Sequence, residues 1–477
     1  MTTVSPKPFL LGGKWVTSST HESVLDPYSG NILAKVCQAD PHHIQEVIES
    51  VQRVAPQFAG TPTHVRATAL TRIAQGIQAR REEFARTLSQ EAGKPITDAR
   101  REIDRGIQTF HIAAEETKRI PGEVLTMDLS PGNEPYTAMI KRFPIGPVLG
   151  ITPFNFPLNL VAHKVAPCLA AGNPIVLKPA PQTPLTALLL GEVFLTTDLP
   201  PEALTILPCS NALAEHLVEH DVFQALSFTG SVSVGWMLKA KARHKRVLLE
   251  LGGNAGVIVE PDADLDLAAT RCAAGGFGYA GQTCISVQRV FVHTSRYDAF
   301  LTDFVKKVQA LQAGDPSQES TVVGPLINDQ AAIRVEAWIQ EALTNGATLR
   351  AGGTRQGRLV EPTVLTDVSP NMKVCCEEVF GPVVTVTPYE SFDEALALLN
   401  QSDFGLQAGI FTTNVDLIFR AYSKLEVGAV LANEIPTFRA DHMPYGGIKQ
   451  SGLGREGVKY MIQELTEPKM LILKTSS

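Results

Sequence analysis

The sequence has few charged and few aromatic residues, and it lacks a strong excess of either charge. Asp, Glu, Lys and Arg make up 19% of the 477 residues and aromatic residues 6%; 42 basic residues stand against 49 acidic ones, a formal net charge of −7. Phosphate backbones and anionic membranes attract strongly basic proteins. We therefore expect no nucleic-acid partner and no membrane partner.

Long apolar runs, metal-ligand spacings and paired cysteines are also absent. No uninterrupted apolar run approaches the roughly 18 to 20 residues that span a bilayer, and residues 1–15 lack the features of a signal peptide. The seven cysteines include no CxxC pair and the eleven histidines no HExxH pattern, so we expect no metal. Scattered, odd-numbered cysteines fit a reducing compartment, and we expect a cytoplasmic protein.

What the sequence does have is apolar residues, 44% of the chain, in an alternating order. Between Gly146 and Leu251, short apolar runs are separated by helix-length segments. This order predicts a doubly wound α/β domain with a parallel sheet and right-handed crossovers. The expected strands are Val148–Ile151, Ile175–Leu177, Leu204–Leu207, Ala225–Phe228 and Val247–Leu251. A second alternating set, at 256–259, 287–292, 363–365 and 383–387, predicts a second α/β domain.

Three segments outside these sets have patterns of their own. Residues 63–117 show helical periodicity, broken at 93–95 by Gly-Lys-Pro. The stretch Tyr136–Phe143 is typical of a strand that leaves the main body. Residues 470–473 form an apolar C-terminal strand, and such an exposed edge usually pairs with a partner.

Five polar side chains lie at or near the expected strand ends. Cys284, among small residues, is a candidate nucleophile or a buried core cysteine. Glu250, between leucines, is a candidate general base or a salt-bridged residue.

Asn155, Lys178 and Ser231 also allow two interpretations each. Asn155 could donate to an oxyanion or belong to a proline turn. Lys178 could bind a nucleotide's ribose or phosphate, or be a solvated loop charge, and Ser231 could seat a pyrophosphate or simply cap a helix. No GxGxxG fingerprint or GxSxG motif is present, which excludes a standard Rossmann dinucleotide site and a serine hydrolase.

Taken together and in order, seven motifs closely resemble the aldehyde dehydrogenase superfamily. The motifs are Phe154–Pro157, Lys178–Ala180, Phe228–Ser231, Glu250–Asn254, Gly281–Cys284, Glu377–Pro382 and Pro444–Gly452. The pattern of Phe438-Arg439 followed by Met443–Gly447 resembles its branch of lactaldehyde and non-phosphorylating glyceraldehyde-phosphate enzymes. The resemblance implies two Rossmann-like domains and a small β oligomerisation domain, and a homodimer or homotetramer. The implied domains are residues 1–124 with 145–252 for the cofactor, 253–448 for catalysis, and 125–144 with 449–477 for oligomerisation.

The resemblance also implies the chemistry. Cys284 would attack an aldehyde to give a thiohemiacetal whose oxyanion is held by the Asn155 amide and the Cys284 backbone N–H. After hydride transfer to NAD or NADP, Glu250 would activate the water that hydrolyses the thioester to a carboxylic acid. A coenzyme A acceptor is the alternative at this step, and a catalytically silent dinucleotide-binding protein is the alternative from another class.

Nine positions are expected to contact the cofactor. Lys178 and Glu378 would bond the riboses, Phe380 would pack near the nicotinamide, and Ser231 would contact the pyrophosphate. The remaining positions are Thr152, Phe154, Pro181, Gly230 and Leu251. Relatives that prefer NAD often carry a glutamate where this chain has Pro181, so we predict that NADP is tolerated, with a preference for NADP left open.

Substrate selectivity is the least determined feature. The expected substrate-binding residues are Arg105, Phe156, Thr283 and Arg439, although the two arginines could instead form surface or interdomain salt bridges. Thr283 and His163 occupy positions where relatives that take strongly anionic aldehydes often carry arginine. We therefore expect a small polar aldehyde, hydroxylated or weakly anionic, with a semialdehyde or a phosphorylated aldehyde as the alternative.

Overall fold

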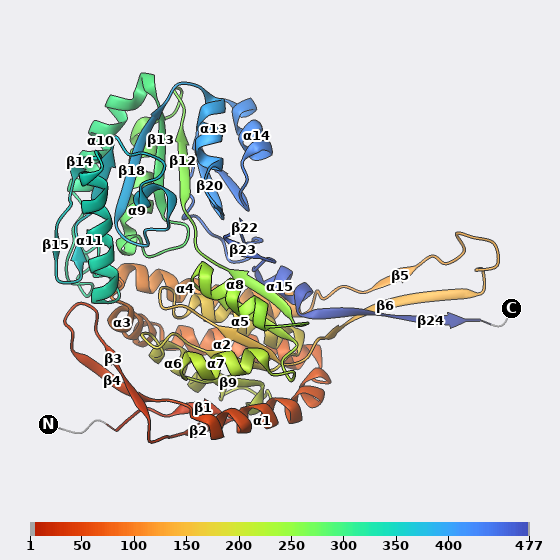
Figure 1. Ribbon diagram of the computed structural model, residues 1–477. Coiled ribbons are helices and arrows are strands. Elements are labelled where there is room, and N and C mark those ends of the chain that lie inside the picture. The colour runs from red at the N-terminus through yellow and green to blue at the C-terminus, as the bar shows by residue number, and fades with distance from the viewer. Residues whose placement is uncertain (1–4, 476–477) are drawn as a thin grey trace.

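Two large sheets, one above the other in Figure 1, form the body of the protein, and a long β arm projects from it. The computed structural model describes residues 5–475.

The first sheet has eight strands in the order β2-β1-β9-β8-β7-β10-β11-β23, and its five middle strands are parallel. Strands β7 to β10 are buried at every residue, as expected for strands covered by helices on both faces. The chain proceeds outward from β7 in one direction and then from β10 in the other, so a crevice opens at their carboxyl ends. The bounds are β1 Phe9–Leu11, β2 Lys14–Val16, β7 Val148–Ile151, β8 Ile175–Lys178, β9 Leu204–Ile206, β10 Ala225–Thr229, β11 Arg246–Glu250 and β23 Gly452–Leu453.

Helices cover this sheet, and one of them is buried throughout. Every residue of α5 (Asn159–Ala171) is buried, including His163 and Lys164. The predicted helical stretch at 63–117 is confirmed with its break at 93–95, and a second break falls at Arg80, whose backbone leaves the helical region. The other helices of this half are α1 Pro41–Ala59, α2 Thr63–Ala79, α3 Arg81–Ala92, α4 Ile96–Thr117, α6 Leu185–Phe194, α7 Asn211–Glu219, α8 Val232–Lys241 and α15 Val458–Glu464.

The second sheet has seven strands in the order β14-β17-β18-β13-β12-β20-β21, all parallel except β14. It confirms the second α/β unit; β14, β20 and β21 are additional to the predicted strands. The strands are β12 Ala255–Val259, β13 Val287–His293, β14 Thr348–Ala351, β17 Thr363–Thr366, β18 Val383–Tyr389, β20 Gln407–Phe411 and β21 Ala429–Ala432. The helices are α9 Leu265–Phe277, α10 Tyr297–Gln309, α11 Asp329–Thr344, α12 Lys373–Cys376, α13 Phe392–Asn400 and α14 Val415–Lys424.

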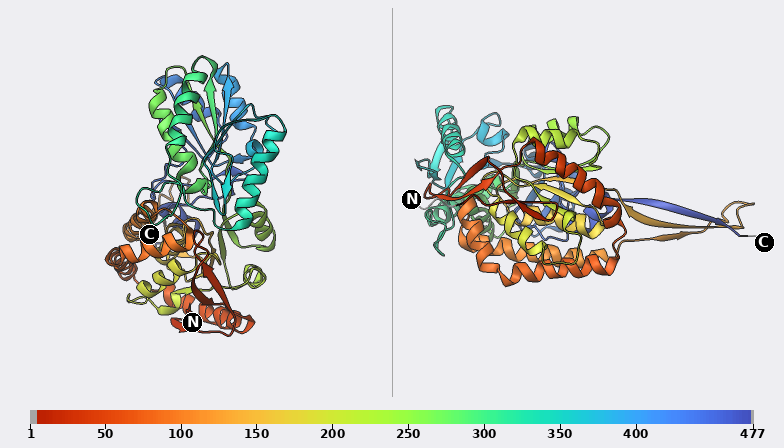
Figure 2. Two further views of the ribbon diagram at one scale, coloured as in Figure 1. Left: turned by 90° about the vertical axis from the view of Figure 1, so that its left-hand side faces the viewer. Right: turned by 90° about the horizontal axis from the view of Figure 1, so that it is seen from below.

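The arm is a three-stranded antiparallel sheet in the order β24-β6-β5, which extends well beyond the body in Figure 2. The excursion β6 (Tyr136–Pro144) pairs along its whole length with the C-terminal strand β24 (Thr466–Lys474), and β5 (Glu123–Leu125) flanks it. Nearly all of β24 is exposed, with Leu471 at 52%. Within 449–475, β23 pairs with β11 of the first sheet, α15 packs on α4 and α5, and β24 enters the arm.

Short elements complete the described chain. They are β3 His21–Leu25, β4 Ile32–Cys37, β15 Arg355–Gln356, β16 Leu359–Val360, β19 Phe404–Gly405, β22 Ile448–Lys449 and the 3₁₀ turns η1 Pro201–Ala203, η2 Gly278–Gly281 and η3 Thr294–Arg296. Between residues 5 and 475, no helix is both long and apolar enough to cross a bilayer.

Candidate active site

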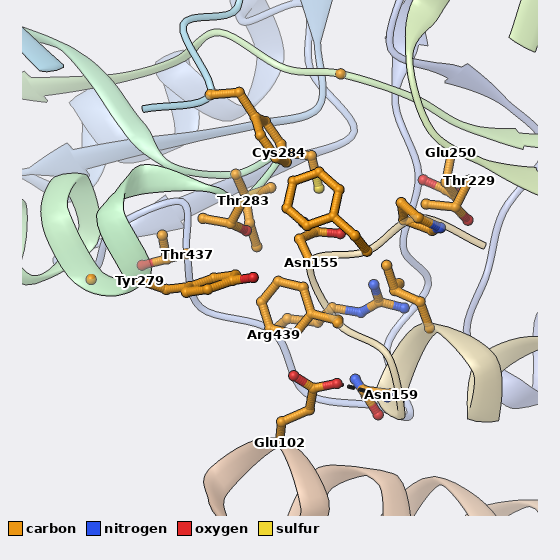
Figure 3. Close-up of a pocket in the computed structure, with 18 of the residues that line it drawn as sticks. Glu102, Asn155, Asn159, Thr229, Glu250, Tyr279, Thr283, Cys284, Thr437 and Arg439 are labelled. Carbon is orange, nitrogen blue, oxygen red and sulfur yellow. Dashed lines mark hydrogen bonds between the residues drawn. The ribbon is translucent and has the colours of Figure 1, made fainter. Parts of the chain in front are cut away.

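A cavity of about 670 Å³ lies between the two sheets and is lined from both. The first sheet contributes the residues that end β10 and β11 and the loop after β7, while the second contributes the segment between α9 and β13. Figure 3 shows Cys284, Asn155, Glu250 and Arg439 around this cavity. The four are far apart in the sequence, and the tertiary structure brings them together.

Cys284 is half-buried at the cavity wall, so it is not a core cysteine. The turn before it is unusual: Tyr279, Ala280 and Gly281 all have positive φ, between 51° and 68°. A side chain at Gly281 would meet the Gly381 carbonyl at 2.3 Å, so the turn needs glycine there. Burial raises the pKa of Cys284 to about 12, and a contact with Tyr445 partly opposes this shift. The resting side chain is therefore a neutral thiol.

Glu250 ends β11 and is only 4% exposed. Among residues 5–475 it has no ion-pair partner, and its Oε2 accepts no hydrogen bond, so the salt-bridge reading does not hold. Burial raises the pKa of Glu250 well above its usual value, the charge of Glu456 adds to the shift, and Arg439 opposes it. A carboxyl group with a raised pKa is suited to proton transfer near neutral pH.

Asn155 follows β7 and points across the cavity toward the Cys284 segment. Its Nδ2 donates to the carbonyl of Gln282 at 2.9 Å, a contact between the two halves and not a local proline turn. The Cys284 backbone N–H donates to no acceptor within residues 5–475. The Asn155 amide and the Cys284 N–H are therefore candidate donors to an oxyanion in this cavity.

A series of buried charged residues leads, through Tyr445, to the sulfur of Cys284. Lys164 contacts Glu456 at 3.1 Å, and the other oxygen of Glu456 lies 3.3 Å from Arg439. The Arg439 guanidinium lies over the Tyr445 ring, 3.7 Å from its centroid, and the Tyr445 hydroxyl is 3.0 Å from the Cys284 Sγ. Although burial works against it, Lys164 and Arg439 lower the pKa of Glu456 to about 2.

Arg439 thus has an ion-pair partner and also faces the cavity. Its side chain is 6% exposed, and its Nε has no acceptor among the described residues. The salt-bridge and substrate readings of this residue therefore do not exclude each other, because donors remain after Glu456 is satisfied.

Arg105, like Arg439, lines the cavity and also has an ion-pair partner. It is 30% exposed and makes a bidentate contact with Asp441, the shorter bond being 2.8 Å. Asp441 also accepts from Asn159 and from His163. The His163 side chain is fully buried by this contact and does not line the cavity. The residue at position 163 consequently carries little information about substrate charge.

The aromatic wall of the cavity is built around a buried lysine. The Nζ of Lys94 lies 3.6 Å from the ring centroid of Phe156 and 4.4 Å from that of Tyr279, and it is ion-paired with Glu102. Phe156 and Thr283, two of the expected substrate-binding residues, line the cavity.

Six of the nine expected cofactor residues line the same cavity: Phe154, Gly230, Ser231, Leu251, Glu378 and Phe380. The side chain of Ser231 makes no capping bond at the start of α8, so its hydroxyl and the helix N-terminus remain available to an anion. Glu378 accepts from the Gly253 N–H at 2.9 Å, and burial raises its pKa to about 7. The Phe380 ring packs edge-on against Phe154.

The other three, Thr152, Lys178 and Pro181, lie outside the cavity, at the carboxyl ends of β7 and β8. Lys178 is 5% exposed and forms no ion pair with any residue from 5 to 475, so it is not a solvated loop charge. Burial lowers its pKa. An unpaired, buried ammonium beside the crevice fits a ribose or phosphate group, and these residues as a set fit a dinucleotide.

Sequence reasoning missed the buried partners: Lys94, Glu102, Lys164, Asp441, Tyr445 and Glu456. One signal was available, because Lys164 interrupts the apolar stretch Asn159–Ala171, where a charge must be paired once the helix is buried. Tyr445 lies within the Pro444–Gly452 motif, and the others lie in loops or on helices without a distinguishing pattern. In the described chain, no cluster of three or more His, Cys, Asp or Glu residues is arranged to hold a metal.

The chain is also similar to known proteins in sequence and in fold. The model of the aldehyde dehydrogenase family matches residues 15–471. The chain is 41% identical to a 3-sulfolactaldehyde dehydrogenase from Priestia aryabhattai, covering 99% of each chain. It is 44% identical, with a TM-score of 0.97 and 99% of each chain covered, to aldehyde dehydrogenase 21 from Physcomitrella patens, solved with the reaction product succinate. A glyceraldehyde-3-phosphate dehydrogenase from Methanocaldococcus jannaschii, solved with NADP, is 36% identical with a TM-score of 0.92, over 96% of this chain and all of that one.

Proposed function

The chain belongs to the aldehyde dehydrogenase family, and we propose that Cys284, Asn155 and Glu250 carry out its NAD(P)-dependent oxidation of an aldehyde to a carboxylic acid. The observation that carries the proposal is their convergence on one cavity from both halves of the molecule.

In the first half of the reaction, the Cys284 Sγ bonds to the carbonyl carbon and releases its proton to solvent. The negative charge that develops on the carbonyl oxygen is accepted by the Asn155 amide and the Cys284 backbone N–H, worth about 3 kcal/mol per donor in comparable sites. When bound, the nicotinamide cofactor accepts the hydride of the resulting thiohemiacetal, which leaves a thioester on Cys284.

In the second half, Glu250 takes a proton from a water molecule as that water attacks the thioester carbon. The C–S bond breaks, the acid leaves and Cys284 is regenerated. Burial raises the pKa of Glu250, and a carboxylate with a raised pKa is a stronger base.

For the substrate, we propose a short aldehyde with an anionic or hydroxyl group at its far end. Arg439 at the cavity wall and Arg105 at its mouth supply positive charge, and Phe156 limits the space between them. Two of the relatives described above are named for a sulfonated and a phosphorylated aldehyde, and the third was solved with a dicarboxylate product. These names favour an anionic group over a hydroxyl group at the far end of the substrate.

A rate measurement tests the catalytic assignment. The protein is mixed with NADP or NAD and a panel of short aldehydes, and reduction is followed at 340 nm. The variant Cys284→Ser should lose on the order of 10³-fold or more in rate. The matched control is Cys376→Ser, because Cys376 is exposed and outside the cavity. Undiminished oxidation by Cys284→Ser would refute the assignment.

The same assay tests the substrate class. Arg105→Ala and Arg439→Ala should each raise KM for a carboxylated or sulfonated aldehyde by roughly 10- to 100-fold, the loss of one charged hydrogen bond. The effect on a neutral aldehyde of equal length should be smaller. Arg86→Ala, which removes a largely exposed guanidinium outside the cavity, is the control. Equal KM changes for the charged and the neutral aldehyde would exclude anion recognition by these arginines.

The proposal also covers the roles of the domains and the assembly of subunits. We propose that residues 1–124 with 145–252 bind the cofactor and that residues 253–448 carry the nucleophile. We also propose that the arm, formed by β5, β6 and β24, joins subunits into a dimer or tetramer through the free edge of β24. A reducing compartment, the cytoplasm, fits seven cysteines of which none forms a disulfide in the described chain.

A further inference from the structure

The hydroxyl of Tyr445 touches the sulfur of the proposed nucleophile. Tyr445 is 3% exposed, and its Oη lies 3.0 Å from the Cys284 Sγ. This sulfur is the only hydrogen-bond partner of the hydroxyl among residues 5–475. A neutral thiol can donate to the tyrosine oxygen, whereas a thiolate can only accept, so the O–H must be the donor once the sulfur is negative.

The surroundings of Tyr445 keep it a donor. Burial raises the pKa of Tyr445 well above its ordinary value, so the phenol keeps its proton. The Arg439 guanidinium, 3.7 Å from the ring centroid and fixed by Glu456, places positive charge on the ring face. A nearby cation favours negative charge on the phenol oxygen, which strengthens the hydrogen bond that its O–H donates.

We propose that Tyr445 is a catalytic residue whose O–H donates to the Cys284 Sγ whenever that sulfur carries negative charge. This happens twice in the reaction proposed above, on which the inference rests: before the C–S bond forms, and again when that bond breaks as water displaces the sulfur from the thioester. The phenol proton stays on Tyr445 in both steps, so no additional proton acceptor or redox partner is needed.

The hydrogen bond from Tyr445 matters because few other neighbouring groups stabilise a negative charge on the Cys284 sulfur. Besides Tyr445, the charged groups that act on Cys284 are Glu250 from β11, Glu378 from the loop after α12 and Arg439 from the loop after β21. The two carboxylates disfavour a thiolate, as does burial, and only Arg439 and the tyrosine O–H favour it. Removing the hydroxyl should therefore have a clear effect on how readily the thiol ionises.

The test is the pH dependence of Cys284 alkylation by iodoacetamide, followed on the Cys284 peptide by mass spectrometry. This readout needs no substrate turnover. The variant Tyr445→Phe keeps the ring beneath Arg439 and removes only the hydroxyl. Alkylation at neutral pH should slow by about tenfold or more, and the profile should move by roughly one pH unit or more to higher pH. An unchanged profile overturns the proposal.

Two further variants make the result specific. Tyr389→Phe also removes a buried hydroxyl, but that hydroxyl lies outside the cavity and donates to the Val259 carbonyl, so the Cys284 profile should stay as in the parent protein. If Tyr445→Phe does not fold, replacing Tyr445 by 3-fluorotyrosine keeps the shape and makes the hydroxyl a better donor. Alkylation below the pH at which fluorotyrosine ionises should then be faster; equal or slower alkylation overturns the proposal. Either negative result would leave the Cys284→Ser test of aldehyde oxidation unaffected.

Discussion

At the scale of single residues, the site depends on side chains whose chemistry is set by burial. Glu250 has no partner and Lys178 has no counter-ion within the described chain, although both are nearly inaccessible to solvent. Unpaired buried charges are costly for a fold and usually mark positions kept for a ligand or a reaction. This reasoning makes both residues suitable for direct tests.

The first residue-scale prediction concerns Glu250. A base acts only when deprotonated, and burial raises the Glu250 pKa, so the hydrolysis rate should rise with pH through an apparent pKa well above 4.5. Glu250→Gln should lower kcat by about 10²- to 10⁴-fold and abolish this pH dependence, while the acyl group accumulates on Cys284. Stopped-flow absorbance and mass spectrometry of the intact protein measure both. A normal kcat in Glu250→Gln would assign the base to another group.

The second residue-scale prediction concerns the choice between NADP and NAD. Pro181 is exposed near the end of β8, where it offers no carboxylate to repel a 2′-phosphate. Pro181→Glu should reduce kcat/KM for NADP by about tenfold relative to NAD, the effect of one like-charge contact. The opposite change, removal of a negative charge, can be made at Glu22. Burial lowers the pKa of Lys178, and the charge of Glu22 partly opposes this effect. Glu22→Gln should shift the ratio toward NADP, and a strong NAD preference of the parent protein would contradict the reasoning from Pro181.

At the scale of elements, the two halves of the site are joined by close backbone approaches. The segment after β11 passes so near the Cys284 carbonyl oxygen that a Cβ at Gly253 would lie 2.1 Å from it. The carbonyl oxygen belongs to the backbone, and a Cβ is fixed by its own backbone, so no side-chain rotation could relieve the clash. The position of the nucleophile thus depends on a glycine in the segment that links β11 to β12.

Gly253→Ala should therefore displace the Cys284 segment. We expect a fall in kcat of about 100-fold, because small displacements of reacting groups have effects of this size. Circular dichroism should show a folded protein. The control is Gly60→Ala, where the nearest atom to an added Cβ lies at 3.5 Å. Full activity of Gly253→Ala would mean that the segment can shift without consequence.

At the scale of the whole molecule, the arm is the feature that the single chain leaves incomplete. Residues Met470 to Leu473 of β24 are each about half exposed, and one edge of this strand has no neighbour within the described chain. An apolar edge strand of this length is normally covered by another chain.

Charges on this strand should therefore lower the assembly state. The double change Leu471→Glu with Leu473→Glu should convert an oligomer to a smaller species, measured by light scattering after size-exclusion chromatography. Ile333→Glu, at a single exposed apolar position on α11, should leave the mass unchanged. An unchanged mass in the double variant would show that β24 is not the subunit contact.

The sequence by itself determined the α/β class, the parallel strands at 148–151 through 247–251 and the identity of Cys284, Glu250 and Asn155 as candidates. These properties follow from local composition, because buried parallel strands read as apolar runs and strand-end polar residues interrupt them. Strands β14, β20 and β21 and the break at Arg80 escaped prediction; at Arg80 no adjoining Gly or Pro marks the break.

Only the tertiary structure decided which charges are paired and which are not. Glu456 neutralises Lys164 and Arg439, Asp441 holds Arg105 and His163, and Tyr445 reaches the sulfur of Cys284, across separations of up to 336 residues. Burial and distance control the strength of each of these interactions, and neither quantity is encoded in a local stretch of sequence.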